Sequence, residues 1–277
     1  MKQNDVLVKW TGSKRLQADQ ILSRFPKEID TYYEPFLGGA SILYASLVRK
    51  VAKKYRCSDL NQPLVGIWTM VRDEPEKLFE DYTVRWNKLK SKGKDYYYET
   101  RSEFNEDQNP CKFFFLLRTC RNGLVRYNKK NEFNSGFHLR RGGIQPANLE
   151  PILNRWHREF SQADIEFECK DYQDVTTKQD DFLYLDPPYM LPKARKTVMY
   201  YGDFDFDALW KWLGKQKSSY LLSLNGFKND EDCTIDVPDQ LYDEFFLVNN
   251  GLNTFDQMSS GKRVVARDGL YVRNHVS

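Results

Sequence analysis

Short runs of apolar, β-branched and aromatic residues recur along the chain and alternate with stretches of helical spacing. We expect strands at 31–36, 55–58, 182–185, 220–224, 244–248 and 270–273. Helical candidates between several of these runs cover 17–25, 40–50 and 206–216. Strands and helices in this order predict an α/β fold with a parallel or mixed sheet.

Between about residues 71 and 160 the strand rhythm stops. Tyrosines, charges and lysine-rich turns replace it in KLKSKGKDYYY, NKKNEFN and HLRRGG. Asn109 followed by Pro110 predicts the start of a helix, because proline suits the first helical position. We interpret 71–160 as an inserted helical and loop-rich domain that divides a second domain into 1–70 and 161–277.

Composition excludes some classes of protein and leaves others open. The 42 basic and 39 acidic residues are nearly balanced, so a nucleic-acid partner would have to be recognised by local clusters. The N-terminus lacks the apolar run of a signal peptide, and we expect a cytoplasmic protein without membrane contact. Five widely spaced cysteines without a CxxC predict buried free thiols, and no metal site is expected.

A glycine pair follows the first expected strand, in YYEPFLGGASILY. Gly38 and Gly39 allow a sharp turn and a close approach to a ligand, and the helix that follows offers free N–H groups. The next strand ends at Asp59, where a carboxylate can accept hydrogen bonds from both ribose hydroxyls. The pattern predicts a nucleoside-containing cofactor, although a purely structural turn is the alternative and no GxGxxG supports a dinucleotide.

The expected strand at 182–185 ends in the unusual corner YLDPPY. In open α/β sheets, ligands bind beyond the carboxyl ends of the strands, which is where Asp186 would lie. The two prolines withhold N–H donors, so the corner presents the Asp186 carboxylate, the Pro187 carbonyl and the flat ring of Tyr189. Acceptors beside a stacking ring suit a planar amine, whereas a solvated proline turn is the alternative.

The exocyclic amine of adenine is a planar amine of this kind and a poor nucleophile. If Asp186 and the Pro187 carbonyl each accept one of its hydrogens, the nitrogen can become tetrahedral and direct its lone pair at an electrophilic methyl group. Neither a histidine nor a metal is required. The sequence therefore allows methyl transfer to an amine at this corner.

Four motifs in their order resemble those of the DNA adenine-N6 methyltransferases, in the branch of the bacterial and phage DNA adenine methylases. They are VKWTGSKRLQADQI, EPFLGGAS, SDLN and DPPY, and RNGLVRYNKKNEFN resembles the DNA-reading segment of that family. The resemblance covers nearly the whole chain. It implies a Rossmann-like S-adenosylmethionine-dependent methyltransferase sheet with the insertion as DNA-recognition domain.

The resemblance also implies a set of cofactor-binding residues. Lys14 would contact the cofactor carboxylate, and Phe36 would flank the sulfonium by cation–π attraction. The glycine loop departs from the more common FxGxG at Ala40. The implied set is Trp10, Lys14, Phe36, Gly38, Gly39, Asp59, Asp171, Tyr172 and Asp186; for Trp10, Lys14, Phe36, Asp171 and Tyr172 the alternatives are core or surface roles.

For DNA, the resemblance implies base flipping and a set of contacts to phosphates and base edges. Tyr189 would replace the lost stacking of the flipped base. Leu124 and Arg126 suggest a GATC target, while Ser135 and Gly136 depart from the family pattern after Asn134. The implied DNA-binding residues are Lys9, Arg121, Asn122, Leu124, Arg126, Asn134, Arg140 and Arg141; for each basic residue taken singly, a solvated surface charge is the alternative.

Two other functions remain open from sequence. An RNA or tRNA adenine methyltransferase would use the same chemistry, and a non-catalytic DNA-binding protein could retain the same scaffold. A protein amine methylase is disfavoured, because enzymes acting on glutamine amides tend to carry Asn where Asp186 stands. We expect a monomer, with a dimer on DNA as the alternative, and a cognate restriction endonuclease as a conceivable partner.

Overall fold

The computed structural model describes residues 6–139, 142–188, 204–229, 231–252 and 265–274. A central sheet has the strand order β3-β2-β1-β4-β5-β8-β7, with the short β6 paired to β5. The strands are β1 Thr31–Glu34, β2 Lys54–Asp59, β3 Asp164–Cys169, β4 Phe182–Leu185, β5 Ser219–Lys228, β6 Glu231–Asp232, β7 Glu244–Leu252 and β8 Val265–Arg273. The helices are α1 Ala18–Leu22, α2 Ser41–Arg49, α3 Gln62–Asp73, α4 Pro75–Lys92, α5 Lys94–Asp107, α6 Pro110–Thr119, α7 Pro146–Ser161 and α8 Phe206–Leu213. The expected mixed α/β sheet of Rossmann type is confirmed.

The direction of the strands determines where a ligand can bind. The pairs β2·β3, β1·β2, β1·β4 and β4·β5 are parallel, whereas β8 is antiparallel to both β5 and β7. From β1 the chain first adds β2 and β3 on one side and later adds β4 and β5 on the other. The strand order therefore reverses between β1 and β4, and such a reversal opens a crevice at the carboxyl ends of the strands.

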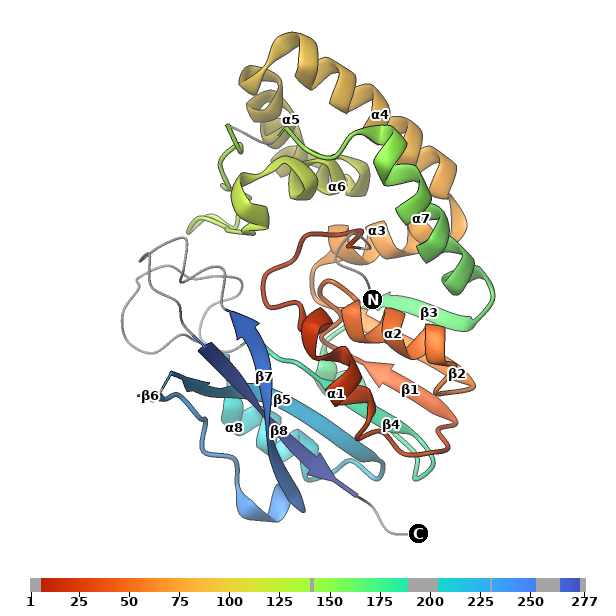
Figure 1. Ribbon diagram of the computed structural model, residues 1–277, viewed down its shortest axis with the longest axis vertical. Coiled ribbons are helices and arrows are strands. Elements are labelled where there is room, and N and C mark those ends of the chain that lie inside the picture. The colour runs from red at the N-terminus through yellow and green to blue at the C-terminus, as the bar shows by residue number, and fades with distance from the viewer. Residues whose placement is uncertain (1–5, 140–141, 189–203, 230, 253–264, 275–277) are drawn as a thin grey trace.

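Both faces of the sheet are covered by helices (Figure 1). All four residues of β4 are buried, and they alternate between the two faces. Phe182 and Tyr184 belong to the hydrophobic cluster that includes α1 and α2, while Leu183 and Leu185 belong to the cluster under α8. A strand buried on both sides reads as a continuous apolar run, which is why this strand was predictable.

The inserted segment is helical, as expected, and its helices α4, α5 and α6 lie together away from the sheet (Figure 1). The predicted start of α6 is confirmed: the side chain of Asn109 accepts hydrogen bonds from Cys111 N and Lys112 N, and Pro110 is the first helical residue. The boundary predicted at residue 71 falls inside α3. The proposed division into two domains therefore stays a prediction.

Two details of the sequence interpretation were wrong. No strand was expected at Asp164–Cys169, yet this segment forms β3 at the edge of the sheet. Three acidic residues in it disguise the strand, and charged side chains are tolerated there because an edge strand has an exposed margin. Cys169 was expected to be buried but is exposed, whereas the other four cysteines are buried.

Within the described ranges, no helix has the length and apolarity to cross a bilayer.

Candidate active site

Asp186 follows β4 directly, at the carboxyl end of this central strand and beside the point where the strand order reverses. Lys14 Nζ donates a hydrogen bond to Asp186 Oδ1 at 2.7 Å. The Lys14 side chain retains only 4% of its exposed area and that of Asp186 19%, so the pair is shielded while part of the carboxylate stays accessible. Lys14 was expected from the sequence to contact a cofactor carboxylate, and the structure pairs it with Asp186.

The Asp186 carboxyl is a weaker acid than an ordinary aspartic acid. Burial raises its pKa to about 6, although the ammonium of Lys14 opposes this shift. The carboxylate of Asp268 adds to the rise. At neutral pH the group is therefore mostly ionised, and it is basic enough to take up a proton.

Glu34 is a second carboxyl near Asp186, and the sequence analysis did not single it out. It ends β1, is 3% exposed, and accepts a hydrogen bond from the Tyr32 hydroxyl at 2.6 Å. Burial raises its pKa to about 8, and the charge of Asp186 acts in the same direction. Glu34 is thus mainly neutral at pH 7, which leaves Asp186 as the ionised acid of this pair.

The glycine loop after β1 is shaped by Trp10. A Cβ at Gly38 would lie 3.0 Å from Cδ1 and Nε1 of Trp10, and one at Gly39 would lie 3.0 Å from its Cβ. Gly38 also has a φ of +47°, which favours glycine. Ala40 has a φ of 53°, so the position that departs from the more common spacing still adopts a left-handed conformation. The glycines are needed because the indole packs against the loop.

Asp59 ends β2 beside this loop. Its Oδ2 accepts a hydrogen bond from Gly38 N and its Oδ1 one from Asn61 N, each at 2.9 Å. Burial raises the pKa of Asp59 and these N–H donors oppose the rise. The carboxylate is oriented by backbone groups and, with about four acceptor sites on its two oxygens, keeps capacity for a further hydrogen bond. Its role as the acceptor for a ribose stays a prediction.

The remaining predicted cofactor residues form an aromatic wall. Phe36 and Tyr172 lie 5.1 Å apart between ring centroids, and both contact Phe204. Tyr172 is buried, and the adjoining Asp171 Oδ1 accepts a hydrogen bond from Gln173 N at 2.8 Å. The partly exposed Phe36 ring leaves an apolar surface next to the carboxyl ends of β1 and β4.

The expected DNA-reading segment lies against the N-terminal motif. A Cβ at Gly123 would be 2.9 Å from Cβ of Lys9, so Lys9 packs directly on the segment. Two isolated bridges, Cys120 to Phe137 and Tyr127 to Phe133, fold residues 120–137 into a compact loop. We call residues 121–137 the recognition loop.

Among the predicted DNA contacts in the recognition loop, Arg121 and Asn134 are exposed, and Leu124 and Arg126 are half-buried. The Nε of Arg126 is buried and makes no hydrogen bond to the described residues. A donor in that state gains a partner when an acceptor such as a base edge or phosphate arrives. Tyr189, Arg140 and Arg141 lie outside the described residues, as does the side chain of Asn122.

Asn61 links the recognition loop to the glycine loop and was missed by the sequence analysis. Its Nδ2 donates to the Tyr127 hydroxyl at 3.0 Å, and its Oδ1 accepts from Leu64 N, which caps α3. Asn61 is 3% exposed. An asparagine just before a helix signals an N-cap, but nothing in the sequence indicates its contact 66 residues away.

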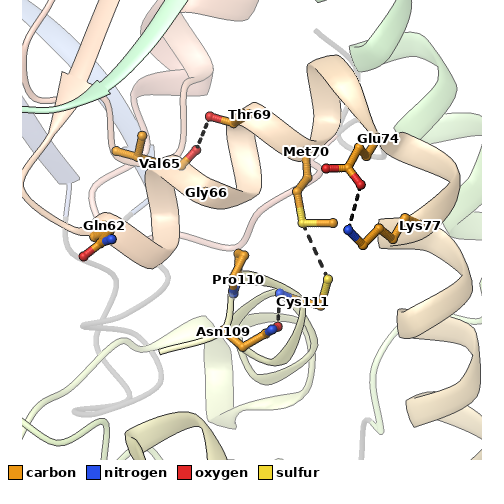
Figure 2. A pocket seen from close by; sticks show the side chains of 10 residues that line it. All are labelled: Gln62, Val65, Gly66, Thr69, Met70, Glu74, Lys77, Asn109, Pro110 and Cys111. Carbon is orange, nitrogen blue, oxygen red and sulfur yellow. Dashed lines mark hydrogen bonds and ion pairs between the residues drawn. The ribbon is translucent and has the colours of Figure 1, made fainter. Parts of the chain in front are cut away.

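A pocket of about 410 Å³ opens between α3 and α6 (Figure 2). Pro110 lies against Gly66, where a Cβ would be 3.1 Å from it, and Glu74 and Lys77 on the same wall form an ion pair at 2.7 Å. No residue predicted to bind cofactor or DNA lines this pocket. It is therefore separate from the site around Asp186.

The comparisons agree with the motifs. A model of the D12 class N6 adenine-specific DNA methyltransferases matches residues 10–222. The type II methyltransferase M.MjaIII of Methanocaldococcus jannaschii is 28% identical over 95% of this chain and 96% of that protein. The DNA adenine methylase of Haemophilus influenzae is 31% identical over 66% of this chain, and the match spans 63% of its own length.

Among solved structures, an rRNA methyltransferase from Streptomyces viridochromogenes is similar over 95% of this chain and 88% of that chain. The TM-score is 0.42 and the sequence identity 13%. A likeness of this size carries no argument about substrate. The match of residues 10–222 spans β1 to β4 with the whole insertion and reaches into β5.

Proposed function

Because the chain belongs to the D12 class of N6 adenine-specific DNA methyltransferases, we propose that it transfers a methyl group from S-adenosyl-L-methionine to the N6 amine of an adenine at a specific site in duplex DNA. The observation that carries the mechanism is the Asp186 carboxylate at the reversal of the strand order, with one oxygen held by Lys14. This arrangement leaves the other oxygen to accept a hydrogen from an amine.

S-adenosyl-L-methionine would supply the electrophilic methyl group on a sulfonium. The residues that would hold it lie around the carboxyl ends of β1 and β2: Asp59, oriented by Gly38 N, would accept from the ribose hydroxyls, and the glycine loop would allow close approach. Phe36 and Tyr172 would flank the cofactor with their rings, and Trp10 would keep the loop in shape. The free acceptor capacity of Asp59 supports this fit.

Asp186 and the Pro187 carbonyl would each accept one hydrogen of the target amine. This withdraws the nitrogen lone pair from the ring and aligns it with the methyl group, which are electrostatic and proximity contributions to catalysis. The nitrogen lone pair would accept the methyl group that the cofactor supplies, and the methylated nitrogen would then release one proton. Asp186, with a pKa of about 6, can take that proton and pass it to solvent.

An adenine inside a duplex cannot reach Asp186, so the base must rotate out of the stack at a cost of a few kcal/mol. We assign its replacement stacking to Tyr189, worth about 1–3 kcal/mol. The recognition loop and Lys9 would contact the duplex, and the unpaired Nε of Arg126 supports a role for this residue in reading DNA. GATC is the target that Leu124 and Arg126 suggest.

Several properties of the whole protein belong to this proposal. We propose a monomer acting where bacterial or phage DNA is found, in the cytoplasm, and a cognate restriction endonuclease encoded elsewhere as a partner. The same chemistry on RNA is the second candidate, and the DNA-reading motif in the recognition loop disfavours it.

Methylation of duplex DNA and of RNA under identical conditions tests the proposal. Each product is digested to nucleosides and separated by mass. We expect N6-methyladenosine in its deoxy form from duplex DNA and little methylation of RNA. Methylation of RNA at a higher rate would overturn the DNA assignment, and sequencing of the methylated DNA would give the target site.

A further inference from the structure

Asp268 is a carboxylate next to Lys14 and Asp186, and it belongs to none of the sequence motifs. It lies on β8, is 4% exposed, and has its Oδ2 3.6 Å from Lys14 Nζ. Building on the proposed function, we propose that Asp268 is a positioning residue for methyl transfer. It holds the Lys14 ammonium on Oδ1 of Asp186, so that the second oxygen of Asp186 stays free for the amine of the target base.

Gln17 fixes the orientation of Asp268. Its Nε2 donates to Asp268 Oδ2 at 2.9 Å, and Gln17 is 2% exposed. Lys14 and Gln17 begin and end a 3₁₀ helix, Lys14–Gln17. Side chains three residues apart in such a helix lie one above the other, so both reach the same oxygen of Asp268. The contact is built from two donors on one short element.

The backbone of the sheet is also adapted at this position. The register of β5 and β8 shifts between Asn225 and Phe227, opposite Asp268 and Arg267. A Cβ at Gly226 would lie 2.5 Å from the Arg267 carbonyl oxygen, so the irregularity requires glycine. Such bulges occur beside active sites, where they redirect a side chain. The neighbouring β8 residues are mainly buried and apolar, and a charge among them is costly without a partner.

The charges around Asp186 explain how Asp268 would act on it. Lys14 supplies one positive charge between two carboxylates, and the buried Glu34 lies close enough for the charge of Asp186 to raise its pKa. Because Lys14 is shared, it neutralises Asp186 only in part. The pKa of Asp186 is raised mainly by burial, is lowered by Lys14, and is raised again by Asp268. Without Asp268, Lys14 would bind Asp186 more fully and make it a poorer proton acceptor.

The test replaces Asp268 by asparagine, which keeps the shape and removes the charge. Single-turnover methylation should slow by about 10- to 100-fold, the range expected when a catalytic group is misplaced. The acidic limb of the pH–rate profile should move to lower pH, and the Kd of the cofactor should stay within about twofold. Asp207→Asn is the control, because it removes one negative charge at an exposed position. It should leave the methylation rate and the acidic limb of the pH–rate profile unchanged.

A purely structural role for Asp268 would not move the acidic limb of the pH–rate profile. If that limb lies at the same pH in D268N as in the wild type, the inference is overturned. If D268N does not fold, Gln17→Leu decides, because it removes the donor that orients Asp268 and keeps every charge. We expect Q17L to lower kcat at an unchanged KM for the cofactor, and wild-type kcat in this variant contradicts the inference. A wild-type protein that makes no methyladenine would instead overturn the proposed function itself.

Discussion

At the residue scale, the raised pKa of Asp186 would set the pH range of the proposed catalysis. A carboxyl with a pKa of about 6 is the hydrogen-bond acceptor that the mechanism requires only above that pH. Single-turnover methylation should therefore fall about tenfold per pH unit once the pH drops below about 6. Rapid-quench measurements between pH 5 and 8 check this, and a rate that stays level down to pH 5 would contradict it.

Glu34 should leave its own signature in the pH dependence of stability. Its pKa is raised to about 8 in the folded protein against 4.5 for an ordinary glutamic acid, so the folded state binds the proton more tightly. Stability from this group is fully present below pH 4.5 and is lost as the pH rises to about 8. Above that pH the contribution no longer changes.

Replacing Glu34 by glutamine should remove this dependence, since the amide keeps the shape and does not titrate. Urea unfolding at pH 5, 7 and 9 measures the difference. We expect the unfolding free energy of the wild type to fall more between pH 5 and 9 than that of E34Q. Parallel curves for the two proteins would show that Glu34 does not titrate in the folded state as described.

At the scale of elements, the hydrogen bond between the Asn61 and Tyr127 side chains joins the recognition loop to the segment that carries Asp59, a predicted cofactor residue. Tyr127→Phe deletes one hydrogen bond, worth about 0.5–1.5 kcal/mol, and leaves the ring in place. We expect DNA binding to weaken by about 2- to 10-fold, because the recognition loop is no longer held in one position. The affinity for the cofactor, measured in the absence of DNA, should change less.

Titration of a fluorescent duplex carrying the methylated site measures this effect. Tyr242→Phe is the matched control, since Tyr242 bonds to Asp239 and packs on Tyr271, neither of which is a predicted DNA-binding residue. Equal DNA affinity for Y127F, Y242F and the wild type would mean that the tether does not position the recognition loop.

The elements also show what sequence can and cannot predict. β4 was predictable because an apolar run stands out, and Gly38, Asp59 and Asp186 became candidate site residues because each stands at or shortly after the carboxyl end of an expected strand. β3 was missed because the charges that an edge strand tolerates hide its period of two. The pairing of an edge strand such as β3 depends on register and strand order, and the local sequence pattern contains neither.

Asp268 illustrates this limit for the active site. Its donor Gln17 is 251 positions away in the chain, and only the pairing of β5 with β8 brings the two together. The sole hint in the sequence is a charged residue within an otherwise apolar strand. Such a residue is costly to bury unless paired, so it identifies a candidate but not its partner.

At the scale of the whole molecule, the larger of the two hydrophobic clusters joins the sheet and the inserted helices. Trp68 on α3 stacks on Trp156 on α7 at 5.2 Å, and Trp10 contacts Phe113 on α6 edge to face. The buried Arg118 on α6 also donates to the Val6 and Leu7 carbonyls. These contacts cross the boundaries predicted between the two domains.

A shared core predicts cooperative unfolding of the whole chain. Far-UV circular dichroism and tryptophan fluorescence should report coincident urea transitions, because the tryptophans lie in both parts and in the core between them. Two separate transitions would mean that the insertion at 71–160 is an independent domain. Trp68→Phe should lower the stability of both parts together.

The central claim is that the Asp186 carboxylate activates the amine of an adenine. Single-turnover transfer from labelled S-adenosyl-L-methionine to duplex DNA, followed by nucleoside analysis, tests it most directly when wild type and Asp186→Ala are compared. We predict N6-methyladenine from the wild type and a rate at least about 100-fold lower in D186A, with the duplex still bound. Methylcytosine as the product, or an undiminished rate in D186A, would contradict it.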